Sequence, residues 1–134
     1  MDQITYQTDR KISVEEFIDL LVRSTLAERR PVHDKVKIGQ MLTYGNILVT
    51  AWHNDLLVGV SRALSDFSFC CYLSDLAVDE AYQHKGIGKE LIRLTHMVAG
   101  DTSLVLLAAP KAAEYYPKIG MDRFTDCFLI KRKN

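Results

Sequence analysis

The residues with the clearest chemical potential join an apolar strand to an amphipathic helix. They are Gln83, His84, Lys85, Gly86, Ile87, Gly88 and Lys89. Glycine removes the Cβ atom where a backbone must approach a ligand, and the first turn of a helix leaves N–H groups without intrahelical partners. Those N–H groups and the helix dipole favour a bound anion. The segment therefore predicts a phosphate-binding loop whose natural guest is a diphosphate.

Two well-known phosphate loops do not fit this segment. A dinucleotide fingerprint needs a third glycine three residues after Gly88, where the chain has Leu91. A P-loop needs glycine at position 83 and serine or threonine after Lys89, but the chain has Gln83 and Glu90. A nucleotide-binding regulatory domain is therefore disfavoured. A glycine pair between strand and helix also forms simple tight turns, so that alternative stays open from the loop alone.

The pattern Gln/Arg-x-x-Gly-x-Gly/Ala after an apolar strand resembles the acetyl-CoA signature of the GNAT superfamily of N-acetyltransferases. A second stretch, residues 112–121, is similar to the Ala-x-x-Phe-Tyr-x-Lys-x-Gly-Phe helix of that family, with Tyr116 at the tyrosine and Gly120 at the glycine. Three positions depart from the family pattern: Ala109, where many members carry asparagine, Pro117 directly after the tyrosine, and Met121 in place of an aromatic residue.

The resemblance implies that acetyl-CoA is the cofactor. In the family, the backbone of the strand before the loop hydrogen-bonds the pantetheine arm, and the matching residues here are Leu76, Ala77 and Val78. Two parallel strands splay apart in the family so that the arm passes between them. The phosphates then fall on residues 83–89, mainly on backbone amides, with added positive charge from the lysines.

The resemblance also implies direct acetyl transfer, in a ternary complex, to a primary amine of a small molecule, amino acid or peptide. An alkylammonium titrates near a pKa of about 10, so the amine must lose a proton and the departing sulfur must gain one. Tyr116 is predicted to protonate the coenzyme A sulfur, as the matching tyrosine does in many members. Asp75 is the predicted base, directly or through water, and Glu114 and His53 are weaker candidates. Many members use a water chain instead.

Two alternatives to this assignment remain open. Tyr116 could pack its ring in the core with its hydroxyl bound to the backbone. The whole domain could also be a non-catalytic module that binds or senses acyl-CoA. No Ser-His-Asp or Cys-His arrangement can be read from the sequence, which favours direct transfer over an acyl-enzyme.

Composition indicates one domain that spans residues 1–134. The 17 basic and 17 acidic residues cancel, so no net field attracts nucleic acid or an anionic membrane. The chain lacks the roughly 18 consecutive apolar residues of a membrane span, and residues 1–3 lack the form of a signal peptide, so a cytoplasmic location is expected. The oligomeric state stays open, with a homodimer as one possibility that the resemblance suggests.

The cysteines and histidines predict neither a disulfide nor a metal site. Cys70 and Cys71 are adjacent on a strand and should point to opposite faces of the sheet, and Cys127 leaves an odd total. The four histidines do not fall at the spacing of metal ligands.

The order of strand-like and helix-like segments predicts an α/β fold with a mixed sheet and helices on both faces, as in the GNAT layout. The expected elements are a strand at 4–7, a helix from a capping box at Ser13 and Glu16, a helix at 32–42, an antiparallel meander of strands at 47–53, 56–64 and 67–78, a helix from Gly88 to Gly100, a strand at 104–108, a helix at 112–116 and a strand at 124–131. The meander is followed by a right-handed crossover to a parallel strand. The continuous apolar run at 104–108 suggests a strand covered on both faces.

Arg29 and Arg30, in the connection before the second helix, either meet an acidic substrate or are solvated.

Overall fold

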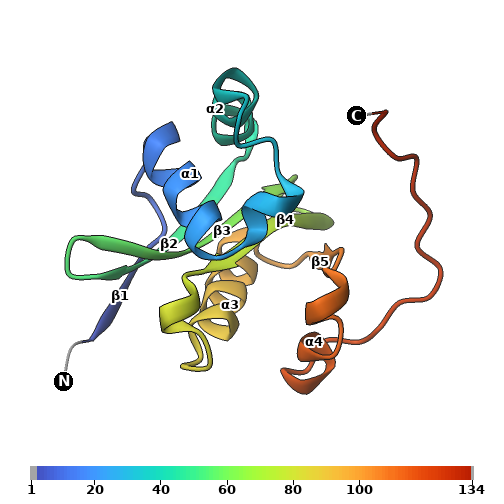
Figure 1. The fold of residues 1–134 in the computed structure, drawn as a ribbon. Coiled ribbons are helices and arrows are strands. Elements are labelled where there is room, and N and C mark those ends of the chain that lie inside the picture. The colour runs from blue at the N-terminus through green and yellow to red at the C-terminus, as the bar shows by residue number, and fades with distance from the viewer. Residues whose placement is uncertain (1–2, 134) are drawn as a thin grey trace.

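In residues 3–133, which the computed structural model describes, the chain forms one five-stranded sheet with the order β1-β2-β3-β4-β5. The strands are β1 (Ile4–Gln7), β2 (Ile47–His53), β3 (Leu56–Ser65), β4 (Cys70–Val78) and β5 (Ser103–Leu106). The first four strands pair antiparallel, and β4 pairs with β5 in parallel (Figure 1). This topology confirms the predicted meander followed by a parallel crossover.

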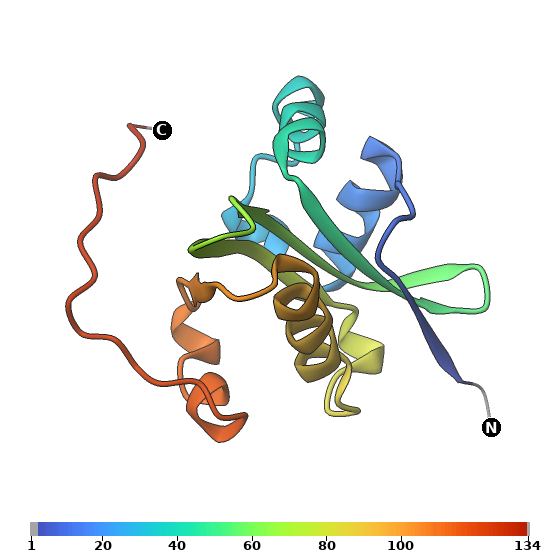
Figure 2. The ribbon, with the colours of Figure 1, turned by 180° about the vertical axis from the view of Figure 1, so that it is seen from behind.

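Helices cover both faces of the sheet, as predicted. The longer ones are α1 (Val14–Arg23), α2 (Lys35–Tyr44) and α3 (Ile87–Ala99), and the shorter ones are the 3-10 turns η1 (Leu26–Arg29), η2 (Glu80–Tyr82) and η3 (Pro110–Ala112) and the helix α4 (Tyr115–Lys118). The ribbon seen from front and back shows α1 and α2 on one face and α3 on the other (Figures 1 and 2). Within residues 3–133, no helix combines the length and the apolar character that a membrane span requires.

The face under α1 is fixed by a local cap and a buried apolar stripe. The Glu16 N–H donates to the Ser13 hydroxyl and the Ser13 N–H donates to the Glu16 carboxylate, each at 3.0 Å, so the predicted capping box is present. Phe17, Leu20 and Leu21 of the helix are fully buried. This packing carries the chain to η1, next to the end of β4.

The opposite face holds α3 close against β3. Ile87 and Leu91 belong to the buried cluster on this face, and a Cβ built on Gly59 of β3 would lie 3.0 Å from a Leu91 methyl carbon. The Thr95 and Ser61 hydroxyls are 2.6 Å apart in the same interface. The absence of a Cβ at Gly59 therefore allows the first turns of α3 to pack closely against β3.

Two predicted boundaries shift because an aspartate holds the local backbone. The second helix starts at Lys35 and not at residue 32, because Asp34 caps it by accepting a 3.0 Å hydrogen bond from the Lys37 N–H. β4 starts at Cys70 and not at residue 67, because the Asp66 carboxylate accepts hydrogen bonds from three consecutive N–H groups, which hold residues 66–69 in a turn. Cys70 is exposed and Cys71 is buried, which confirms their opposite orientation.

The C-terminal region departs furthest from the predicted elements. The helix predicted at 112–116 is instead the turn η3 followed by α4, because Pro110 supplies a fixed φ that starts the turn earlier. The predicted strand at 124–131 is wrong. Residues 121–133 contain neither helix nor strand and run away from the body of the protein (Figure 1). β5 is therefore an edge strand, with Val105 55% exposed, and is not covered on both faces.

Candidate active site

The candidate site opens where β4 and β5 part. The parallel pairing runs from Cys70 with Ser103 to Leu73 with Leu106. β4 then continues to Val78 with only β3 beside it in the described sheet. This confirms the predicted splaying of the two parallel strands and leaves one edge of β4 open to a ligand.

A cleft with a volume of about 610 Å³ lies along this open edge. That volume lies within the usual range for small-molecule sites. Leu76, Ala77 and Val78 line the cleft from β4, Gln83 lines it from the following loop, and Tyr116 lines it from α4. The fold therefore brings three predicted parts of the site, which are separated along the chain, to one cavity.

A bulge in β4 marks the start of the open edge. Arg62 of β3 pairs with Asp75 and Ala63 pairs with Leu73, which leaves Ser74 as an extra residue in β4. Such a bulge bends a strand and redirects the side chains that follow. It coincides with the point where pairing to β5 ends, so it helps to separate the two strands.

Asp75 is fully buried beneath the bulge, between two guanidinium groups. Its carboxylate accepts a 2.5 Å hydrogen bond from Nε of Arg30 and a second one from Nε of Arg62. Arg30 also donates to the Ser74 carbonyl at 2.8 Å, and Arg62 donates to the Ser74 hydroxyl at 3.0 Å. Asp75 is absent from the cleft lining, whereas Arg30 reaches it.

This geometry disfavours the predicted role of Asp75 as a general base. A proton acceptor must come within hydrogen-bond reach of the substrate, directly or through one water. Both carboxylate oxygens of Asp75 are engaged by arginines, and its side chain is shielded from solvent. The same contacts show that Arg30, whose side chain is 22% exposed, is bound to Asp75 and Ser74, whereas Arg29 is exposed at the cleft.

The loop between η2 and α3 has the backbone that an anion site requires. His84 and Gly86 adopt positive φ angles of 64° and 83°, and a Cβ at Gly86 would meet nothing within 4 Å. The first α-helical hydrogen bond at the start of α3 runs from the Glu90 N–H to the carbonyl of Gly86, the residue before the helix, at 3.1 Å. Within the described chain, the N–H groups of Ile87 and Gly88 have no backbone acceptor. These donors fit the diphosphate of a CoA-type group, and the adjoining cleft fits its pantetheine arm.

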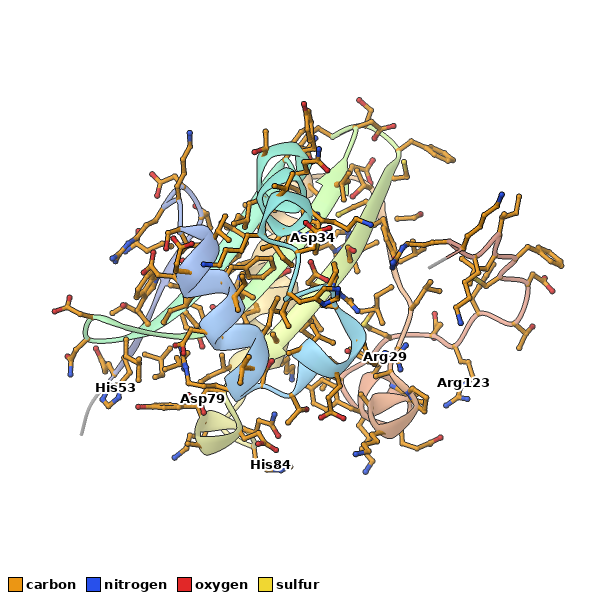
Figure 3. All side chains as sticks on the ribbon, turned by 45° about the horizontal axis from the view of Figure 1, so that its top comes forward. Arg29, Asp34, His53, Asp79, His84 and Arg123 are labelled. Atoms are coloured by element: carbon orange, nitrogen blue, oxygen red, sulfur yellow. The ribbon has the colours of Figure 1, made fainter. Side chains whose placement is uncertain are left out.

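The loop is held in place by the side chains of Asp79 and Arg23, for which the sequence makes no prediction, and by that of Gln83. The Asp79 carboxylate accepts from the Ala81 N–H at 2.8 Å and from Nη1 of Arg23 at 2.6 Å. The Gln83 amide donates to the Val78 carbonyl at 3.1 Å, so this side chain supports the loop from within. Figure 3 shows Asp79 and His84 on the same segment between β4 and α3. An aspartate just before a turn is a capping signal, whereas its distant partner Arg23 leaves no signal in the sequence.

Tyr116 lines the cleft, and its phenol is protonated at neutral pH. Burial raises the pKa of Tyr116 above its ordinary value of 10.0, and the neighbouring Tyr115 raises it further. The two rings make an edge-to-face contact with centroids 5.3 Å apart. At neutral pH Tyr116 is therefore a hydrogen-bond donor.

The two weaker base candidates lie outside the cleft. His53, at the end of β2, has Nδ1 2.5 Å from the Tyr82 hydroxyl. Glu114 is exposed and pairs with Arg123 at 3.1 Å. Neither residue contributes to the cleft lining, whereas two other carboxylates, Glu28 and Glu80, do.

A second cavity of about 640 Å³ lies between the segment that follows β1 and the end of α2. Arg10 is among its lining residues, and the guanidinium carbon lies 3.6 Å from the centroid of the Trp52 ring. None of the predicted site residues lines this cavity. Of the predicted site residues, Leu76, Ala77, Val78, Gln83 and Tyr116 line the β4–β5 cleft, whereas Asp75 and residues 84–89 are not among its lining residues.

Comparison with known proteins agrees with this geometry. Histone acetyltransferase TAP1 of Glycine max is 33% identical over 69 residues, which cover 49% of this chain and 30% of that protein. The structure of a probable acetyltransferase, SA2161 from meticillin-resistant Staphylococcus aureus, superposes with a TM-score of 0.79 at 18% identity, covering 97% of this chain and all of the other. The aminoglycoside N-acetyltransferase AAC(6')-Iy, solved in complex with CoA, gives a TM-score of 0.76 at 12% identity and covers 100% of this chain and 97% of its own.

The structural likenesses establish the fold, and a family model establishes the family. The model described as an acetyltransferase (GNAT) domain matches residues 44–120, which include β4, the loop before α3, and Tyr116. This chain therefore belongs to the GNAT family of acetyltransferases.

Proposed function

We propose that this acetyltransferase transfers the acetyl group of acetyl-CoA directly to a primary amine of a small molecule, amino acid or peptide, within a ternary complex. The observation that carries the proposal is the shared cleft, in which the open edge of β4, Gln83 of the proposed anion-binding loop and Tyr116 line one cavity. A structural neighbour that is named an N-acetyltransferase and was solved with CoA supports the same chemistry.

The cofactor would be held mainly by backbone groups. Leu76, Ala77 and Val78 offer the unpaired edge of β4 to the pantetheine arm, and residues 83–89 offer N–H groups to the diphosphate. Lys85 and Lys89 add positive charge beside it. Hydrogen bonds to charged groups contribute about 1.5–3 kcal/mol each. Three or four of them therefore approach the roughly 8 kcal/mol of a micromolar complex.

When bound, acetyl-CoA supplies an activated thioester carbonyl. Backbone N–H groups along Leu76–Val78 would polarise that carbonyl in the manner of an oxyanion hole. A carbon–nitrogen bond forms and the carbon–sulfur bond breaks, so the amine loses a proton and the sulfur gains one. The Tyr116 phenol would donate the proton to the sulfur, because burial keeps it protonated and Tyr116 lines the cleft.

The amine proton would leave through water rather than to a dedicated side-chain base. Asp75 is engaged by two arginines, and His53 and Glu114 lie outside the cleft. Glu28 and Glu80 are exposed carboxylates of the cleft lining, so either can pair locally with an ammonium-bearing acceptor, although Arg29, Arg30 and Lys111 line the same cleft. Asp75 acts in this proposal as a positioning residue for the open edge of β4.

Calorimetric titration with acetyl-CoA, with NADH and ATP as controls, tests the cofactor assignment. We expect micromolar binding of acetyl-CoA alone. A panel of primary amines, followed by release of free thiol, then tests transfer. Equal binding of all three nucleotides would reduce the loop to a general anion site. Acetyl-CoA binding without turnover of any amine would instead favour a non-catalytic acyl-CoA sensor.

A further inference from the structure

The Tyr115 side chain reaches from α4 to the first turn of α3. The Tyr115 hydroxyl lies close enough to the Lys89 backbone N–H for that group to lower the pKa of Tyr115. A Cβ built on Gly88 would lie only 3.1 Å from that same oxygen. The hydroxyl therefore touches two consecutive residues of the helix start, which is the part of α3 whose N–H groups lack intrahelical partners.

The position of this hydroxyl is fixed by packing. The Tyr115 ring makes its edge-to-face contact with Tyr116 at an interplanar angle of 75°. Tyr115 is 37% exposed, so most of its surface rests on the protein while one side meets solvent. An anion bound by the N–H groups of the first turn of α3 would lie within reach of this oxygen, because the oxygen already contacts that turn.

We propose that the Tyr115 hydroxyl is a ligand of the CoA diphosphate and donates its proton to a phosphate oxygen. A hydroxyl has one donor and two acceptor lone pairs, so it can donate to the phosphate and still face the Lys89 N–H. This inference rests on the proposed use of acetyl-CoA. It gives the adjacent tyrosines different tasks, with Tyr115 at the diphosphate and Tyr116 at the thioester.

The ionisation of Tyr115 agrees with a donor role. Burial raises the pKa of Tyr115 above its ordinary value of 10.0, and the nearby Lys89 N–H opposes part of that rise. The phenol therefore keeps its proton at neutral pH. Glycine at position 88 fits the same arrangement, because a side chain there would press against the hydroxyl.

The test is calorimetric titration of the full chain with acetyl-CoA, comparing wild type, Tyr115→Phe and the control Tyr44→Phe. Phenylalanine keeps the ring contact with Tyr116 and removes only the hydroxyl, and Tyr44 is exposed at the end of α2. We expect Tyr115→Phe to weaken binding about tenfold, as the loss of one hydrogen bond to a charged group implies, and Tyr44→Phe to leave it unchanged. The same loss should appear with 3′-dephospho-CoA, which retains the diphosphate.

Three results would overturn the assignment of Tyr115. Unchanged affinity would show that the hydroxyl only caps α3. Tighter binding would show that it competes with the phosphate for the Lys89 N–H. A loss seen with acetyl-CoA but not with 3′-dephospho-CoA would move the contact to the 3′-phosphate. Failure of the wild-type protein to bind acetyl-CoA would instead overturn the proposed function, and this inference with it. Circular dichroism of each variant separates these results from misfolding.

Discussion

The two halves of β4 are held in the sheet in different ways. Residues 70–73 lie between β3 and β5, with Cys71 and Leu73 buried in the core. Residues 74–78 have only β3 beside them, and all of them except the buried Asp75 line the cleft. The first half is held by strand pairing on both sides, whereas the second half must stay in place with one edge open for a ligand.

The difference between the halves is reflected in two aspartates. Asp66 is exposed and accepts backbone hydrogen bonds that arrange the turn before residues 70–73, the closed half of β4. Residues 74–78 form the open half. Asp75 is buried and joins the open half to Arg62 of β3 and to Arg30 at the end of η1. A strand can thus lose one partner without losing its position, because side-chain ion pairs replace the missing backbone bonds.

Replacing Asp75 should have the largest effect on the protein. Asp75→Asn removes the charge that two arginines share, and Arg62 is only 8% exposed at its side chain. Loss of one partner of a buried ion pair costs about 3–5 kcal/mol. We expect the free energy of unfolding, measured by urea denaturation, to fall by that amount.

The matched control for this change is Asp66→Asn, which alters the exposed aspartate and should lower stability much less. Activity measurements then separate two roles for Asp75. If Asp75→Asn keeps its stability but loses turnover, the carboxylate acts as the base that the sequence predicts, and the division between the halves of β4 is not structural.

Replacing Tyr116 tests whether the open half serves catalysis. Tyr116→Phe keeps the buried ring and removes the proton donor, so kcat should fall by about 10²-fold while the dissociation constant of acetyl-CoA changes little. Because the pKa of Tyr116 is raised by burial, the wild-type rate should not decline from loss of this proton until the pH exceeds about 10. An unchanged kcat in Tyr116→Phe would assign the tyrosine to packing.

Local signals in the sequence predicted the parts of the fold that depend on near neighbours. The Ser13 and Glu16 capping box, the turn between the strands predicted at 47–53 and 56–64, and the helix stop at Gly100 are all readable because the interacting groups are a few residues apart. The cleft residue Tyr116 is predicted by the family motif at residues 112–121 and not by a physical signal in the sequence. The structure confirms its position in the cleft, while its chemical role stays a prediction.

Contacts between residues that lie far apart in the sequence could not be predicted from it. Asp75 meets Arg62 across 13 residues and Arg30 across 45, and the first contact depends on the bulge at Ser74. Strand register is set by packing and turn geometry, so a pair of this kind has no periodic signature. The contact of Tyr115 with Lys89 also depends on how α4 docks, which the sequence does not encode locally.

The pH dependence of the turn at Asp66 should be a smaller effect on the closed half. Hydrogen bonds from the backbone of Phe69, Ser68 and Cys70 lower the pKa of Asp66 from 3.8 to about 2. The pKa of Asp66 is lower in the folded than in the unfolded protein, so its ionised carboxylate stabilises the fold. This contribution is complete above about pH 4 and is lost as the pH falls toward about 2.

Urea denaturation at several pH values provides the measurement for Asp66. The difference in midpoint between wild type and Asp66→Asn should shrink as the pH decreases from about 5 to about 3. A difference that stays constant over this range would show that ionisation of Asp66 does not stabilise the turn.

Removal of the C-terminal segment should have the smallest effect. Phe128 and Ile130 are 92% and 99% exposed, so truncation after Met121 removes side chains that contribute little buried surface. We expect a change below about 1 kcal/mol in the free energy of unfolding, as for surface changes elsewhere.

The sequence pattern of residues 124–131 predicts a strand, and β5 has an unpaired edge. If truncation costs several kcal/mol, or if hydrogen exchange shows protected amides in this segment, the segment pairs with β5 in solution. Size-exclusion chromatography of both forms would then tell whether it pairs within one chain or between two. In either case β4 would keep its open edge, but β5 would no longer mark the end of the sheet.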